Sequence, residues 1–213
     1  MIFIIKNFVK SKFLLVLLLS SCQINLLDRG NYEELLSLLN SFSEEEINDY
    51  MYFYENNPYS FLVLRYPKKE VLFVAASIED GYLLWVGPNQ ELIRTLNGKI
   101  VSTYGLPRNI KTLSPSKVKF EKNRITSHLV KFDGEPSNVK SSITLFDEQV
   151  CKFNHPNLIS DKCIISEETI FIDNINWQRK NIYYLNDNQE VVKTLQYYHP
   201  LEEQIEITFY YKR

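Results

Sequence analysis

The sequence predicts an all-β fold in which antiparallel, meandering sheets form a barrel-like or sandwich domain, preceded by one or two short N-terminal helices. Runs of β-branched and aromatic residues alternate with tight-turn signals, and no strand–helix alternation interrupts them. The chain also has 14 Tyr and 13 Phe against only six Gly, a balance that favours strands over long helices. The remainder after residue 30 is long enough to bury a substantial core in one domain.

Residues 1–21 have the features of an export signal. Three lysines and no acidic residue precede a compact apolar stretch, Phe13–Leu19. The small residues Ser20 and Ser21 follow it. A basic start, an apolar centre of ~7–15 residues and small residues at the cleavage point are typical of a secretory signal peptide. The lysines interrupt the only stretch that approaches the roughly 20 apolar residues of a spanning helix, so an uncleaved anchor is disfavoured.

Cys22 follows this signal in the stretch LSSCQ. The order Leu-Ser-Ser-Cys resembles the bacterial lipobox, in which the cysteine is acylated and becomes the first residue of the mature protein. We therefore expect lipid attachment at Cys22, a tether over 22–30 and a single periplasmic domain over 31–213. By resemblance to enteric sorting rules, Gln23 in place of Asp favours the outer membrane. The alternative is a secretory signal that carries a cysteine by chance.

Cys151 and Cys163 are the two remaining cysteines. Lipidation of Cys22 accounts for the odd number in an exported protein and leaves these two free to pair. In an oxidising compartment a disulfide between them would contribute on the order of 3 kcal/mol. The alternative is two reduced, partly buried thiols, because the sequence does not show whether their β-carbons face each other.

Charge and motifs narrow the functional classes. Without residues 1–21 the chain has 21 basic and 26 acidic residues, a net charge of −5 with histidine neutral. A chain with this net charge lacks the excess of basic residues that is typical of a protein that binds nucleic acid. No nucleophile, zinc or phosphate-loop motif occurs, and the three histidines lie far apart in the sequence. We expect no catalytic residue, no metal site and no cofactor.

Two short helices are expected before the strands. The first covers 32–39, where leucines cluster, and the second begins at Ser43, with which Glu46 completes a capping box. Four apolar residues of the second helix lie at helical spacing: Ile47, Tyr50, Met51 and Tyr54.

Turn signals divide the remaining chain into strands. Asn97-Gly98 is the strongest two-residue hairpin signal, and Glu79-Asp80-Gly81 is another turn of this kind. The expected strands are Ser60–Tyr66, Glu70–Ile78, Tyr82–Val86, Glu91–Leu96, Lys99–Tyr104, Lys117–Glu121, Ile125–Phe132, Ser141–Val150, Ile164–Ile172, Asn181–Leu185, Val191–Tyr198 and Gln204–Tyr211. So many short strands must curl into a barrel or fold into a sandwich to protect their edges.

Two tryptophan-centred segments carry a resemblance to a known family. They are EDGYLLWVGPNQELIRTLNGKIVSTYGLP at 79–107 and WQRKNIYYLNDNQEVVKTLQYYHP at 177–200. With the lipobox, they resemble the group 4 capsule and YjbF-like lipoprotein family, whereas residues 108–165 do not align with it. The resemblance implies a barrel-like fold and a non-enzymatic outer-membrane lipoprotein of capsule or exopolysaccharide secretion, facing the periplasm. It also implies an outer-membrane β-barrel exporter and a periplasmic companion as partners.

Two roles agree with this resemblance. One is an accessory or scaffold component, held at the membrane by lipid on Cys22. The other is a polysaccharide- or lipid-binding module, in which Trp85, Tyr82 and Tyr104 line a groove for sugar rings or the curled sheet holds an acyl chain. Core packing is the competing explanation for each of these aromatic residues. A polysaccharide-modifying enzyme is a third role, and it would need two carboxylates across a cleft.

Overall fold

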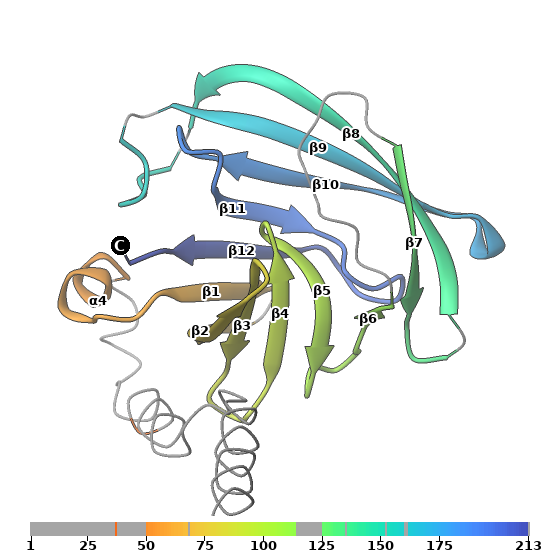
Figure 1. The fold of residues 1–213 in the computed structure, drawn as a ribbon, viewed down its shortest axis with the longest axis horizontal. Coiled ribbons are helices and arrows are strands. Elements are labelled where there is room, and N and C mark those ends of the chain that lie inside the picture. Colours follow the sequence, from red (N-terminus) through yellow and green to blue (C-terminus); the bar gives the residue numbers. More distant parts are fainter. Residues whose placement is uncertain are drawn as a thin grey trace, which may run out of the picture.

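The computed structural model describes residues 37, 50–67, 69–113, 125–134, 136–151, 153–159 and 162–212. Within these residues the chain forms a closed antiparallel barrel of twelve strands, a short α-helix, α4 (Tyr50–Asn56), and a 3-10 turn, η1 (Asp173–Ile175) (Figure 1). The predicted all-β class is confirmed, and the architecture is the barrel. Four expected features lie outside the described residues: the tether with Cys22, the 32–39 helix except for Ser37, the Ser43–Glu46 capping box and the Lys117–Glu121 strand.

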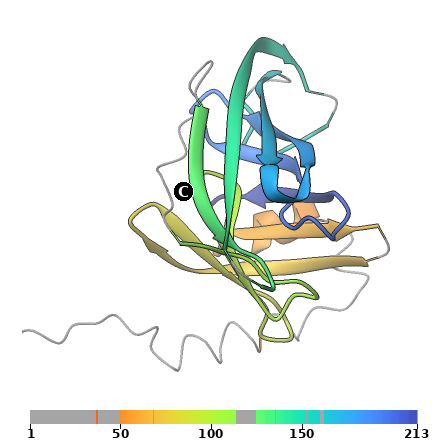
Figure 2. The ribbon, with the colours of Figure 1, turned by 90° about the vertical axis from the view of Figure 1, so that its right-hand side faces the viewer.

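Each strand pairs with its neighbour in the sequence, and the first strand closes the ring by pairing with the last. The strands are β1 Phe61–Tyr66, β2 Lys69–Glu79, β3 Tyr82–Val86, β4 Leu92–Leu96, β5 Lys99–Tyr104, β6 Lys111–Thr112, β7 Ile125–Lys131, β8 Pro136–Val150, β9 Lys162–Ile172, β10 Trp177–Leu185, β11 Val191–Gln196 and β12 Ile205–Tyr210. Figure 2 shows β7 and β8 standing across β1 and β2, as expected of strands tilted around a barrel.

One strand, β6, was not predicted, and β8 and β10 begin four or more residues before their predicted starts; the other predicted strands among the described residues differ by at most two residues at either end. β6 was not predicted, because its two residues are too few to show an alternating pattern. β8 begins at Pro136 rather than Ser141, since a proline is tolerated as the first residue of a strand. β10 begins at Trp177 rather than Asn181, because the exposed residues 178–180 interrupt the alternation of apolar and polar side chains.

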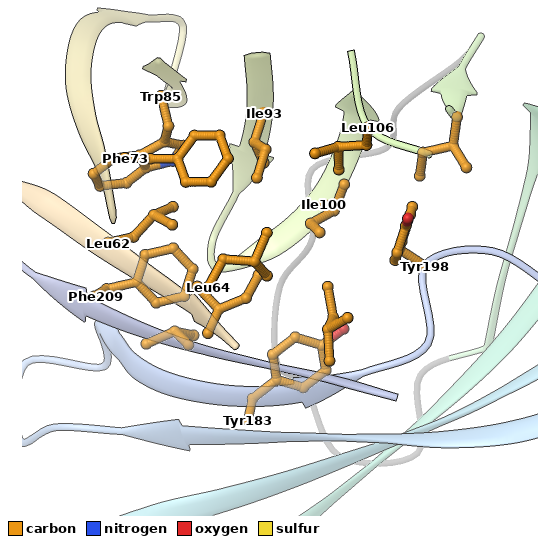
Figure 3. Packing of buried hydrophobic residues seen from close by; sticks show 14 of the residues in the cluster. Leu62, Leu64, Phe73, Trp85, Ile93, Ile100, Leu106, Tyr183, Tyr198 and Phe209 are labelled. Atoms are coloured by element: carbon orange, nitrogen blue, oxygen red, sulfur yellow. The ribbon is translucent and has the colours of Figure 1, made fainter. Parts of the chain in front are cut away.

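The barrel interior is the main hydrophobic core. Side chains that alternate inward along the strands pack against one another there, among them Leu62, Phe73, Trp85 and Phe209 (Figure 3). The strand register explains this grouping, because Leu62 of β1 lies between Phe73 of β2 and Phe209 of β12. Aromatic and aliphatic side chains therefore fill the barrel interior next to β1, β2, β3 and β12.

Helix α4 covers a second apolar layer on the outer face of β1, β2 and β12. The Phe53 ring contacts the Phe61 ring edge to face at 4.7 Å, and Phe61 stacks on Tyr210 at 4.4 Å. The predicted helix stripe is wrong at Met51, which is 43% exposed. Phe53 takes its place, because the buried face of α4 passes through Tyr50 and Phe53 at a spacing of three residues.

The β4–β5 hairpin brings its tip against the opposite wall of the barrel, near β11 (Figure 1). Asn97 and Gly98 both have positive φ, 47° and 73°, as a two-residue hairpin turn requires. A Cβ atom on Gly98 would lie 2.5 Å from Val191 Cγ1, so only glycine allows this approach. The turn therefore places the first residues of β5 beside β9, β10 and β11.

Candidate functional site

A cluster of charged and polar side chains crosses the barrel interior next to this hairpin tip. Lys99 of β5 forms an ion pair with Glu168 of β9, with Nζ 2.5 Å from Oε1 and side chains only 12% and 3% exposed. The Tyr183 hydroxyl of β10 donates a hydrogen bond to Glu168 Oε2 at 2.7 Å, and Asn181 Nδ2 donates to the same oxygen at 3.4 Å. Both carboxylate oxygens of Glu168 therefore have donors.

The surroundings of Glu168 keep it ionised. Burial alone raises the pKa of a carboxyl group, but the charge of Lys99 and the hydrogen bonds from Lys99 and Tyr183 outweigh burial and hold the Glu168 pKa below its usual value. Burial and the nearby carboxylate raise the pKa of Tyr183 well above its usual value, so its hydroxyl stays a donor. The cluster is thus a compensated ion pair with a neutral phenol.

The side chain of Gln196 on β11 forms hydrogen bonds to the tip of the β4–β5 hairpin across the barrel. Its Nε2 donates to the Gly98 carbonyl at 3.0 Å and to Thr194 Oγ1 at 2.8 Å, while its Oε1 accepts from the Ile100 N–H at 3.1 Å. Gln196 is 1% exposed, and these three bonds satisfy its amide, as a buried polar group requires. The ion pair and this amide together link β5 to β9 and β11.

The space beside the cluster is small. The interior cavity there has a volume of about 30 Å³, and its lining includes Lys99, His128, Trp177, Asn181 and Gln196. Ligand sites usually measure about 300–1,000 Å³, whereas a water molecule needs only about 10–15 Å³. This cavity has room for water but not for an acyl chain.

Trp85 does not belong to a surface groove. It is 0% exposed, and its Nε1 donates to Thr95 Oγ1 at 2.9 Å within the core. Tyr82, three positions earlier on β3, points to the other face by strand alternation, where the Arg94 guanidinium lies 4.2 Å from its ring centroid. The predicted groove is therefore wrong for Trp85.

Tyr82 and Tyr104 are also far apart along the sheet. Tyr82 pairs with Leu96 at the end of β4, whereas Tyr104 pairs with Leu92 at its beginning. Tyr104 is 68% exposed, so it does not pack in the core. The three predicted aromatic residues consequently form no common binding surface.

Cys151 and Cys163 are joined in a disulfide, with their Cα atoms 5.7 Å apart. The loop between them carries Asn157, whose side chain pairs with the Tyr211 backbone: Nδ2 donates to the carbonyl at 2.8 Å, and the N–H donates to Oδ1 at 2.9 Å. The disulfide thus closes a loop that is hydrogen-bonded, through Asn157, to the backbone just after β12.

Three buried histidines, His128, His155 and His199, make the fold sensitive to acid, because burial lowers the pKa of each. Burial lowers the pKa of both His128 and His155 to about 4, with nearby Lys99 adding to the effect at His128 and Lys193 at His155. The unfolded value is about 6.5, so below this pH the unfolded chain binds more protons than the folded chain. This contribution to stability is complete above about pH 6.5 and is lost as the pH falls toward 4.

We expect the free energy of unfolding to fall by roughly 1–2 kcal/mol for each of His128 and His155 between pH 7 and pH 5. Urea denaturation across this range measures the change. In the matched variant His155→Phe, whose ring can keep the contact with Tyr210 seen at 4.9 Å, the acid dependence should be smaller, because one of the three buried histidines is removed. An unfolding free energy that is flat from pH 7 to pH 5 would contradict neutral, buried histidines.

Sequence reasoning missed the interior cluster because no local motif marks it. The one available signal is Glu168, a charge that shares strand parity with Ile164 and Ile170 and therefore faces inward. Within the described residues, no group of three His, Cys, Asp or Glu side chains is arranged to hold a metal ion. No helix in that part of the chain has the length and apolar content needed to cross a membrane.

The barrel has a counterpart among solved structures. The crystal structure of the hypothetical lipoprotein YmcC from Escherichia coli K12 aligns with a TM-score of 0.67 and 15% identity, covering 90% of this chain and 98% of that one. No curated protein matches the chain. The family model described as group 4 capsule polysaccharide lipoprotein gfcB, YjbF matches residues 53–210, which include all twelve strands of the described barrel. The chain therefore belongs to the GfcB/YjbF family of group 4 capsule polysaccharide lipoproteins.

Proposed function

We propose that the protein is a non-enzymatic scaffold of capsule or exopolysaccharide secretion, anchored in the outer membrane by acylated Cys22 and facing the periplasm. Family membership supports the capsule system, and the stretch LSSCQ supports the lipid anchor. The observation that supports the scaffold role is the packing of the described barrel residues into a hydrophobic core, where the cavity beside the ion pair measures only about 30 Å³.

The interior ion pair also favours a structural role. A strongly perturbed carboxylate is a common mark of a catalytic site. Here Lys99 and Tyr183 contact both oxygens of Glu168, and the neighbouring space is too small for a sugar. The proposed partners, an outer-membrane β-barrel exporter and a periplasmic companion, would contact the outer surface of this rigid domain.

Replacing the proposed lipid-attachment residue, Cys22→Ser, should leave a precursor that retains residues 1–21 and is lost from the outer membrane, with lower polysaccharide export. The hydroxyl cannot form the thioether that carries the acyl chains, and stable anchoring needs two or more of them. Gel mobility, membrane fractionation and surface polysaccharide are the measurements.

The matched control is the double variant Cys151→Ser/Cys163→Ser, which removes the disulfide but leaves Cys22 in place. It should be processed and localised like the wild type. A Cys22→Ser protein that is processed and membrane-bound would overturn the lipid anchor. Crosslinking in cells that captures an outer-membrane β-barrel protein would support the scaffold, and polymer cleavage by the purified protein would overturn it.

A further inference from the structure

An open groove lies on the surface where β10 begins, beside the loop from β11 to β12. Its volume is about 410 Å³, far larger than the interior cavity and within the usual range of ligand sites. The lining residues are Arg179, Tyr197, Glu202, Glu203 and Gln204.

The Tyr197 ring lines this groove, and Trp177, outside the lining, packs against it. Trp177 and Tyr197 are half-buried, and their rings stand edge to face at 83° with centroids 6.4 Å apart. The Arg179 guanidinium lies 5.7 Å from the Trp177 centroid and 5.6 Å from the Tyr197 centroid. The groove thus combines an aromatic ring with a cation.

The charged groups of the groove have hydrogen-bonding capacity to spare. Arg179 Nη1 donates to the Gln178 carbonyl at 2.8 Å, which leaves other guanidinium donors for a ligand. In the described part of the chain, no ion pair engages Arg179, Glu202 or Glu203. Guanidinium donors and carboxylate acceptors therefore stand at the same groove without neutralising one another.

The interior cluster is hydrogen-bonded to the backbone of Tyr197 through Asn181. The Tyr197 backbone N–H donates to Asn181 Oδ1 at 2.8 Å, and Asn181 in turn contacts Glu168 and Tyr183. Tyr197 and Trp177 also line the interior cavity. Side chains held in this way by a buried network are positioned before a ligand arrives, which favours binding.

We propose that this groove binds an uncharged, hydroxyl-rich ring of a polysaccharide, which packs on Tyr197, while Trp177 holds the Tyr197 ring in position. One face of a pyranose ring presents C–H groups that contact an aromatic ring. Its hydroxyls both donate and accept, so they match the donors of Arg179 and the acceptors of Glu202 and Glu203. Two carboxylates against one guanidinium disfavour an acidic ring, and the choice of a glycan rests on the proposed function.

Calorimetric titration of the full-length lipidated protein in detergent micelles tests the proposal. The probes are dextran oligosaccharides and size-fractionated fragments of the polysaccharide exported by the producing cells. We expect saturable binding of at least one probe, weakened about tenfold or more in Trp177→Ala and in Arg179→Met. Trp177→Phe should bind nearly as well as the wild type, because it keeps an aromatic ring against Tyr197.

Tyr104→Ala is the matched control, since Tyr104 is an exposed aromatic residue outside the groove lining. It should bind like the wild type. Absence of saturable binding to both probes, equal loss in Tyr104→Ala, or tighter binding of hyaluronate than of either probe would overturn the proposal. Normal processing and membrane location of Trp177→Ala would show that a failure here is separate from a failure of the proposed lipid-anchored function.

Discussion

Replacing Glu168 by Gln should lower the free energy of unfolding by about 3–5 kcal/mol, because it leaves the Lys99 ammonium in the barrel interior without a countercharge. Lys99→Met should have a cost in the same range, since it leaves a buried carboxylate with neutral donors but no countercharge. Urea denaturation at pH 7 measures both variants.

The double variant Lys99→Met/Glu168→Gln is the matched control. It removes both charges together, so no unpaired ion remains, and most of the stability lost in each single variant should return. The pair joins β5 to β9, and no other ion pair in the described barrel has both side chains this deeply buried. Single variants that cost less than about 1 kcal/mol, or a double variant that costs their sum, would show that the ion pair does not link these strands.

Replacing Trp85 by Ala should cost about 3–5 kcal/mol, because it opens a cavity at the site of a fully buried indole. The variant also removes the donor to the Thr95 hydroxyl and the contact with Phe209, whose ring centroid lies 5.7 Å from that of Trp85. Thermal or urea unfolding measures the loss.

Two matched variants separate the causes. Trp85→Phe keeps much of the volume and loses only the N–H donor and part of the ring, so about 1–2 kcal/mol is expected. Trp177→Ala should cost clearly less than Trp85→Ala, since Trp177 is only half-buried. If Trp85→Ala and Trp177→Ala were equally stable, the assignment of Trp85 as fully buried and of Trp177 as half-buried would fail.

Local turn chemistry made the hairpins predictable. The turn Asn97-Gly98 fixes where β4 ends and β5 begins, so the predicted Lys99–Tyr104 strand matches the structure. The face of Trp85 was not predictable, because every residue of Tyr82–Val86 is apolar and no alternation distinguishes inside from outside.

The interior cluster and the surface groove depend on closure of the barrel. Lys99 and Glu168 are 69 residues apart in the sequence, and no local pattern shows that the hairpin tip reaches β9. The groove was not predicted from the sequence, because the three consecutive exposed residues 178–180 break the alternating pattern that would mark the start of β10. An aromatic residue and an arginine two positions apart, Trp177 and Arg179, share one strand face and were the available signal.

The pairing of β1 with β12 has a consequence for how the molecule is made. It joins residues 61–65 to residues 206–210, so the first strand waits for nearly the whole polypeptide before it acquires its partner on that side. Contacts between such distant segments slow folding, because a long loop must close before they form. Closure of the ring therefore depends on the last strand to be synthesised, and truncation of β12 leaves both β1 and β11 with an unpaired edge.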